Sequence, residues 1–162
     1  MANNKYWISL NDFARRKTIE VNVGGTPLGG SNPIRVQTMT TTNTNDTIAT
    51  AEQCIRAFEA GAEYVRITTQ GVKEASNLEN IKKELIKRGY NIPLVADIHF
   101  NPSAAIEAAK HVDKVRINPG NFVDSRAKFE NVTTPTKSMQ LNLQKLRKNL
   151  YLLLAFARNV EL

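Results

Sequence analysis

The chain has 162 residues, of which 41% are hydrophobic and 23% are charged. This composition is typical of a globular protein and excludes a mostly disordered or collagen-like chain. The length suits one domain better than two. The longest purely apolar run, Tyr151 to Ala157, is far too short to span a membrane, and the N-terminus has no apolar signal core. We therefore expect a cytoplasmic protein with no membrane partner.

Positive charge is concentrated near the C-terminus. The net charge is +7, and residues 125–162 carry seven basic but only two acidic side chains. Such a region could be a nucleic-acid or membrane-surface patch, or a solvated helix face. We favour the solvated face, with no nucleic-acid partner, because neither an aromatic-lined basic groove nor a known nucleic-acid motif accompanies the charge.

The single cysteine, Cys54, limits the possible metal chemistry. One thiol cannot form an internal disulfide, nor can it hold a thiolate metal site or an iron–sulfur cluster from this chain alone. Its apolar neighbours within a predicted helix indicate a core position rather than a catalytic one. We predict no metal site in this chain.

The pattern of strands and helices predicts an α/β fold preceded by a β-hairpin. Residues 18–23 alternate polar and apolar side chains, and glycine-rich turns follow. Four further strands are predicted at Ile34–Met39, Tyr64–Thr68, Pro93–Asp97 and Lys114–Asn118. Helices are predicted between them at Thr47–Ala60, Val72–Arg88 and Pro102–Lys110. This alternation predicts a parallel sheet, either in a TIM-type (β/α)8 barrel or in a doubly wound fold.

The chain divides into three predicted parts. Residues 1–33 form an N-terminal segment with the hairpin, and residues 34–130 form the strand–helix repeats. Residues 131–162 form a basic tail, in which Ser138–Ala157 has the apolar stripe of an amphipathic helix. The glycine-rich motifs of Rossmann and P-loop proteins follow none of the strands, which weakens a nucleotide-binding interpretation.

Unusual polar residues gather where the predicted strands end. Arg66 and Arg116 occupy equivalent places in two otherwise apolar strands, and Asp97 and His99 end a third. An arginine in an apolar strand is costly unless it is paired or faces a ligand. The planar guanidinium suits phosphate oxygens, so the two arginines predict an anionic, phosphorylated ligand.

Each of these residues also has a structural interpretation. Arg66 could pair with Asp97 and only fix the strand register, and His99 could be a structural histidine. His111, beyond the third helix, is better explained as a surface or capping residue. Residues 43–46 resemble a loop that ends in a helix cap.

Four short sequence motifs resemble those of one known family. They are VQTMT at residues 36–40, YVRIT at 64–68, VADIHF at 95–100 and VRINPGN at 115–121. In this order they resemble the N-terminal part of the 4-hydroxy-3-methylbut-2-enyl diphosphate synthase family, over about Arg15 to Phe129. The family acts in the methylerythritol phosphate route to isoprenoids.

The resemblance implies roles for the residues at the strand ends. It implies a TIM barrel that binds methylerythritol cyclodiphosphate. Arg66 and Arg116 would clamp the diphosphate. Asn118 and Asn121 would bind nearby, and Asp97 and His99 would orient substrate groups or manage protons as catalytic residues.

The resemblance also implies a cofactor and an electron donor. In the family, a separate domain carries a 4Fe-4S cluster held by three cysteines and a glutamate, and flavodoxin or ferredoxin supplies two electrons. The substrate ring then opens and a hydroxyl leaves as water. Because Cys54 is the only cysteine, we expect this chain to bind substrate without turning it over.

The chain contains only about four of the eight strand–helix units of a barrel. We therefore hypothesise a truncated or frame-disrupted product of a longer gene. Unpaired strand edges would favour a homo-oligomer. Two alternatives stay open: a non-catalytic half-barrel module for anion binding or assembly, and another TIM-barrel enzyme related to dihydropteroate synthase.

Overall fold

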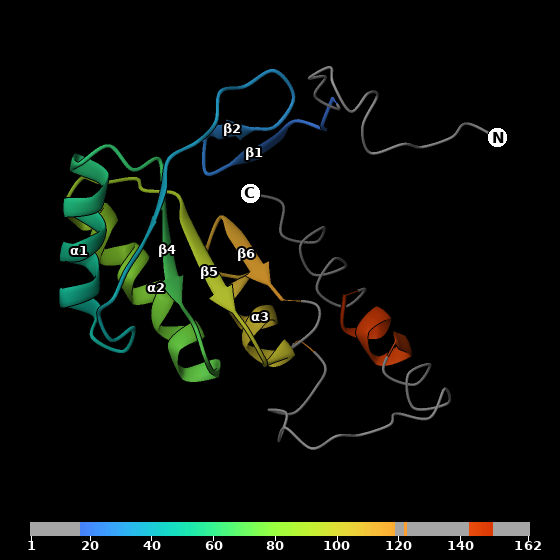
Figure 1. Cartoon of the computed structure of the whole chain (residues 1–162). Helices are drawn as coiled ribbons and strands as arrows, with labels where there is room; N and C mark the ends of the chain where they lie inside the picture. Colours follow the sequence, from blue (N-terminus) through green and yellow to red (C-terminus); the bar gives the residue numbers. More distant parts are fainter. Residues whose placement is uncertain (1–16, 119–121, 123–142, 151–162) are drawn as a thin grey trace.

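The computed structural model describes residues 17–118, Phe122 and residues 143–150 (Figure 1). An antiparallel hairpin comes first, made of β1 (Val21–Val23) and β2 (Thr26–Leu28). A parallel sheet follows, made of β3 (Gln37–Met39), β4 (Tyr64–Thr68), β5 (Leu94–Ile98) and β6 (Lys114–Ile117). Its connections contain α1 (Thr47–Glu59), α2 (Val72–Lys87) and α3 (Pro102–Ala108).

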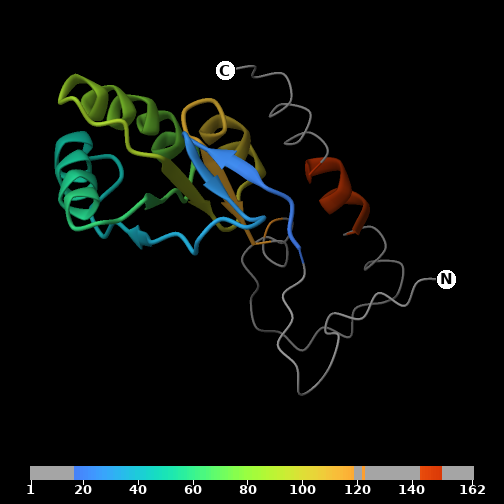
Figure 2. The same cartoon turned by 90° about the horizontal axis from the view of Figure 1, so that it is seen from above.

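The sheet is wound in one direction. Its strand order is β3-β4-β5-β6, so each strand lies beside the next one in the sequence. The three helices cover one face of the sheet, as the view from above in Figure 2 shows. A doubly wound sheet would reverse its order and place helices on both faces. The fold is therefore a partial TIM-type barrel preceded by a hairpin, as predicted.

The helices begin and end at the expected signals. The Asp46 side chain caps α1 by accepting a hydrogen bond from the amide of Ala49, and Asn101 caps α3 in the same way. Gly61 and Gly89 follow α1 and α2 with positive φ angles of 98° and 86°. Each helix ends one or two residues earlier than predicted, because its last residues form the turn.

The strand that opens the sheet is shorter than predicted. Ladder pairing begins at Gln37 rather than Ile34. The carboxylate of Glu63 accepts hydrogen bonds from the Val36 amide at 2.8 Å and from the Arg35 guanidinium at 2.7 Å. The Val36 amide therefore bonds to a side chain, whereas the Val36 carbonyl still accepts from the backbone amides of Glu63 and Tyr64. The periodicity of the sequence could not reveal this change of partner.

Other strand limits shift by one to three residues. The hairpin strand begins at Val21 rather than at residue 18, and β6 ends at Ile117 rather than Asn118. The third predicted strand runs Leu94–Ile98 instead of Pro93–Asp97. Pro93 lacks the amide hydrogen that a ladder position would use.

The main core lies between the sheet and its helices. Val65, Ile67, Ala96 and Ile98 project toward the helices and are fully buried. Cys54 belongs to this core, and burial raises the pKa of its thiol to about 12. The thiol therefore stays protonated, which confirms the predicted core position.

The hairpin closes the amino ends of the strands. Val23 of β1 packs with Tyr64 and Val95 in a second buried cluster on the sheet face opposite the helices. The Tyr64 hydroxyl donates a 2.9 Å hydrogen bond to the carbonyl of Thr26. Figure 1 shows the hairpin at the end of the sheet from which β4, β5 and β6 start. Loops and polar side chains lie at the opposite end of the sheet, where the carboxyl ends of the strands are.

The predicted C-terminal helix is described only in part. Residues 143–150 are helical, and Leu146 packs against the main core. The other residues of the predicted Ser138–Ala157 helix lie outside the described part of the chain. The division into three parts at residues 33 and 130 stays a prediction.

Candidate functional site

The sheet register places the predicted polar residues on one face. Because neighbours along a strand alternate between faces, Arg66 and Asp97 project away from the helices that Ile67 and Ala96 contact. Thr68, Asp97 and Arg116 lie side by side in one row across three strands. The sheet therefore presents a polar row at the carboxyl ends of its strands.

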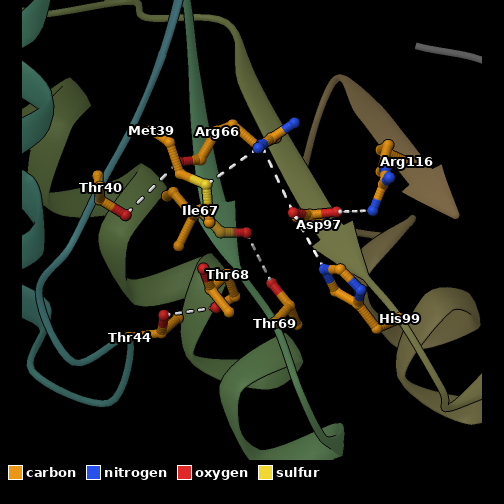
Figure 3. A network of polar contacts seen from close by, with 10 residues as sticks. All are labelled: Met39, Thr40, Thr44, Arg66, Ile67, Thr68, Thr69, Asp97, His99 and Arg116. Carbon is orange, nitrogen blue, oxygen red and sulfur yellow. Dashed lines mark hydrogen bonds and ion pairs between the residues drawn. The ribbon is translucent and has the colours of Figure 1, made fainter. Parts of the chain in front are cut away.

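Asp97 lies at the centre of this group, as Figure 3 shows. Its side chain is only 2% exposed. One carboxylate oxygen accepts a 2.8 Å hydrogen bond from Nη1 of Arg116. The other lies 3.5 Å from Nε of Arg66 and 3.3 Å from Nε2 of His99. Four residues chosen from sequence alone therefore meet around one buried carboxylate.

The pair that Arg66 forms with Asp97 is incomplete. Its Nε atom is buried and makes no hydrogen bond within the described residues, so the 3.5 Å contact is an ion pair without a hydrogen bond. Its Nη2 atom lies 3.1 Å from the sulfur of Met39, and a thioether is a weak acceptor. The pairing with Asp97 that the structural interpretation requires is thus present, but within the described residues it uses only part of the guanidinium's hydrogen-bonding capacity.

Positive charge exceeds negative charge in this group. Two guanidinium ions share the single carboxylate of Asp97. The side chains of Arg66 and Arg116 stay 30% and 39% exposed, so both can reach a ligand while Asp97 holds them. Buried charges are stable when paired, and the surplus cation favours an added anion.

His99 is oriented by two contacts. Its Nε2 atom faces the Asp97 carboxylate, and its ring lies 5.9 Å from that of Phe100. The side chain is 38% exposed. A histidine held by a carboxylate and open to solvent can donate or accept a proton at its other ring nitrogen.

The remaining predicted residues divide into two groups. Asn118 directly follows β6, beyond the row that contains Arg116, whereas Asn121 lies outside the described residues. His111 is remote from the group and contacts Glu107 of α3 at 3.2 Å. Its amide donates to the carbonyl of Ala108 in the turn that follows α3, two residues after the C-cap Ala109.

Threonines bind the loops to the ends of the strands, and the sequence does not predict these contacts. The Thr44 hydroxyl donates a 2.6 Å hydrogen bond to the carbonyl of Thr68. The amides of Thr40 and Thr69 donate to the carbonyls of Arg66 and Asp97 at 2.8 and 3.0 Å. The one available signal is the run of threonines that directly follows a predicted strand.

The described residues do not fit an iron–sulfur cluster. They contain no group of three or more histidine, cysteine, aspartate or glutamate side chains placed to hold a metal. Cys54 is buried in the core, away from the polar row. Among the described helices, none is long and apolar enough to cross a membrane.

The sequence matches a known family over most of its length. Residues 18–144 match the GcpE TIM-barrel domain. The chain is 51% identical over 148 residues to the 4-hydroxy-3-methylbut-2-en-1-yl diphosphate synthase (flavodoxin) of Protochlamydia amoebophila, covering 91% of this chain and 23% of the relative. It is 49% identical over 144 residues to the chloroplastic ferredoxin-type synthase of Oryza sativa subsp. japonica, covering 89% of this chain and 19% of the relative.

A third relative shows a similar proportion. The flavodoxin-type synthase of Porphyromonas gingivalis is 55% identical over 120 residues, which cover 74% of this chain and 21% of the relative. The chain therefore spans about a fifth to a quarter of the length of these curated relatives.

Proposed function

Because the chain belongs to the GcpE TIM-barrel family, we propose that it is the substrate-binding part of a 4-hydroxy-3-methylbut-2-en-1-yl diphosphate synthase. The complete enzyme would open 2-C-methyl-D-erythritol 2,4-cyclodiphosphate reductively. The reaction takes up two electrons and two protons, breaks a ring C–O bond and releases one water. Flavodoxin or ferredoxin would supply the electrons, as the names of the relatives state for those proteins.

The pair of arginines around Asp97 carries the proposal. The side chains of Arg66 and Arg116 are 30% and 39% exposed, and with the one carboxylate of Asp97 between them they carry a net positive charge and N–H donors that a ligand can reach. A diphosphate has oxygens on both phosphorus atoms, so one arginine can bind each phosphate. Asn118 and Asn121 would add hydrogen bonds from the segment after β6.

Asp97 and His99 would act on the substrate in different ways. Asp97 would hold both arginines and the imidazole in place. His99 would use the ring nitrogen that does not face Asp97 to orient an oxygen of the substrate or to move a proton. Both roles agree with the exposed ring of His99 and the buried carboxylate of Asp97.

Electron transfer would need groups that these residues do not provide. The sequence has one cysteine, and its thiol is buried and protonated. The proposed role of this chain is therefore binding and orientation, with no turnover by the chain alone. A cytoplasmic location stays a prediction.

The test is binding of the cyclodiphosphate to the full chain by titration calorimetry. We expect Arg66→Ala and Arg116→Ala each to weaken binding about 10- to 100-fold, because a hydrogen bond to a charged group contributes about 1.5–3 kcal/mol. Arg56→Ala is the matched control, since Arg56 lies on the exposed side of α1 and its loss removes the same charge elsewhere.

Two results would contradict the proposal. If both site variants bind as tightly as the parent, the arginines are not the diphosphate site. If Arg56→Ala weakens binding equally, the attraction is only that of a basic protein. Circular dichroism of each variant checks that its fold is unchanged.

A further inference from the structure

The loop between β3 and α1, residues 40–46, is anchored to the strand that carries Arg66. Strand β3 stops at Met39, paired with Arg66, whereas β4 continues to Thr68. The last two residues of β4 therefore have no β3 ladder partner on that side. A backbone carbonyl without a partner is costly when it is shielded from water, so this end of β4 needs another donor.

The loop supplies that donor from a side chain. The Thr44 hydroxyl donates to the carbonyl of Thr68 at 2.6 Å, and Thr44 is 5% exposed (Figure 3). At the start of the same loop, the amide of Thr40 donates to the carbonyl of Arg66 at 2.8 Å. The loop thus holds β4 on both sides of Ile67, at Arg66 and Thr68, whose side chains lie on the same sheet face as Asp97.

Two helices fix the loop in turn. Gln53 of α1 accepts hydrogen bonds from the amides of Thr41 and Thr42 at 3.0 and 3.1 Å. Asn77 of α2 donates to the carbonyl of Thr44 at 2.8 Å. The polar row is therefore connected to the helix layer through amide side chains on adjacent helices.

We propose that Thr44 is a positioning residue for the anion site, which sets the end of β4 and with it the Arg66 guanidinium. The proposal rests on the proposed function, because the anion is the ligand whose binding Thr44 would tune. Thr44 is buried, and its contact with the row among the described residues is the hydrogen bond to the backbone of Thr68. A small displacement of a binding group weakens a site that depends on precise geometry.

The experiment compares Thr44→Val with Thr44→Ser in the full chain, using inorganic pyrophosphate as the probe. Valine keeps the shape of threonine but removes the hydroxyl, whereas serine keeps the hydroxyl. We expect Thr44→Val to raise the Kd about three- to tenfold through the loss of one positioning contact, and Thr44→Ser to bind like the parent. Amide exchange at Thr40 should be faster in the valine variant and unchanged in the serine variant.

Several outcomes separate this proposal from the proposed function. Equal Kd values for Thr44→Val and the parent, or an equal loss in Thr44→Ser, would overturn the role of Thr44. If the parent binds neither pyrophosphate nor the cyclodiphosphate, the proposed function fails; faster Thr40 exchange in Thr44→Val then still supports the anchoring of β4, and unchanged exchange refutes it. If the parent binds the cyclodiphosphate but not pyrophosphate, the same comparison of the two Thr44 variants is made with the cyclodiphosphate.

A second variant covers the case in which Thr44→Val does not fold. Asn77→Ala removes the donor to the Thr44 carbonyl from outside the polar row, and Asn91→Ala, at an exposed asparagine between α2 and β5, is its control. We expect weaker pyrophosphate binding in Asn77→Ala than in Asn91→Ala. Equal binding in the two variants would count against the proposal.

Discussion

At the scale of single residues, Asp97 is the group on which the site depends. Its buried carboxylate faces two guanidinium groups and one imidazole, all of which keep contact with solvent. Such a carboxylate has two effects: it reduces the repulsion between the arginines, and it fixes the direction in which each points. Without it, Arg66 and Arg116 would be two like charges on the two strands that flank β5.

Asp97→Asn tests this arrangement. We expect the free energy of unfolding to fall by about 1–2 kcal/mol, because the amide keeps an acceptor for Arg116 but loses the charge, and partial exposure of both arginines limits the cost. Urea denaturation of the full chain measures the change. Asp46→Asn is the control, since asparagine caps a helix as well as aspartate does. An Asp97→Asn variant as stable as the parent would show that the carboxylate is dispensable.

The residues of the site were more predictable than their contacts. Alternation along each strand places Arg66, Asp97 and Arg116 on one face, and parallel strands bring their carboxyl ends together. The hydrogen bond from Thr44 to Thr68 joins residues 24 positions apart and depends on where β3 stops. That endpoint follows from pairing in three dimensions, which periodicity does not encode.

At the scale of elements, the hairpin is positioned by one close backbone contact. Gly24 has φ +56°, and a Cβ atom there would lie 2.9 Å from the Cβ of Pro93 and 3.0 Å from the carboxyl carbon of Asp113. Asp113 is held in place, because it accepts hydrogen bonds from Lys82 and from the Leu94 amide at 2.7 and 2.9 Å. The turn therefore fits against the amino ends of two strands only without a side chain.

Gly24→Ala should weaken this packing. We expect a loss of about 2–3 kcal/mol in the free energy of unfolding, from backbone strain and the clash with Pro93 together. Gly25→Ala separates the two causes, because Gly25 has φ +88° but nothing within 4 Å of an added Cβ. It should lose only about 1 kcal/mol, the cost of the left-handed conformation. Equal losses in urea denaturation would mean that the close contact contributes nothing.

Helices were easier to predict than strands in this chain. The caps Asp46 and Asn101 and the stops Gly61 and Gly89 are local signals, and each marks a helix end within two residues. The start of β3 depends instead on Glu63, which follows α1 in the sequence and accepts a hydrogen bond from the Val36 amide. Strand limits depend on such distant partners, so they shifted most.

At the scale of the whole molecule, the sheet has two outer strands. Within the described residues, β3 and β6 each pair with one neighbouring strand only. Two large apolar side chains precede β3 and face solvent: Ile34 is 79% and Val36 is 58% exposed. A strand edge beside exposed apolar groups is a surface on which another strand can add.

We therefore predict that the chain self-associates through the β3 edge. Such association would give the homo-oligomer that we expect from the sequence. Light scattering should show a mass that rises with concentration, and Val36→Lys should lower it by placing a charge beside the edge. Ile86→Lys is the matched control, because Ile86 is 57% exposed but lies on α2, away from β3. A mass equal to one chain at every concentration would contradict the prediction. An equal effect of both lysine variants would assign the association to general hydrophobicity rather than to the strand edge.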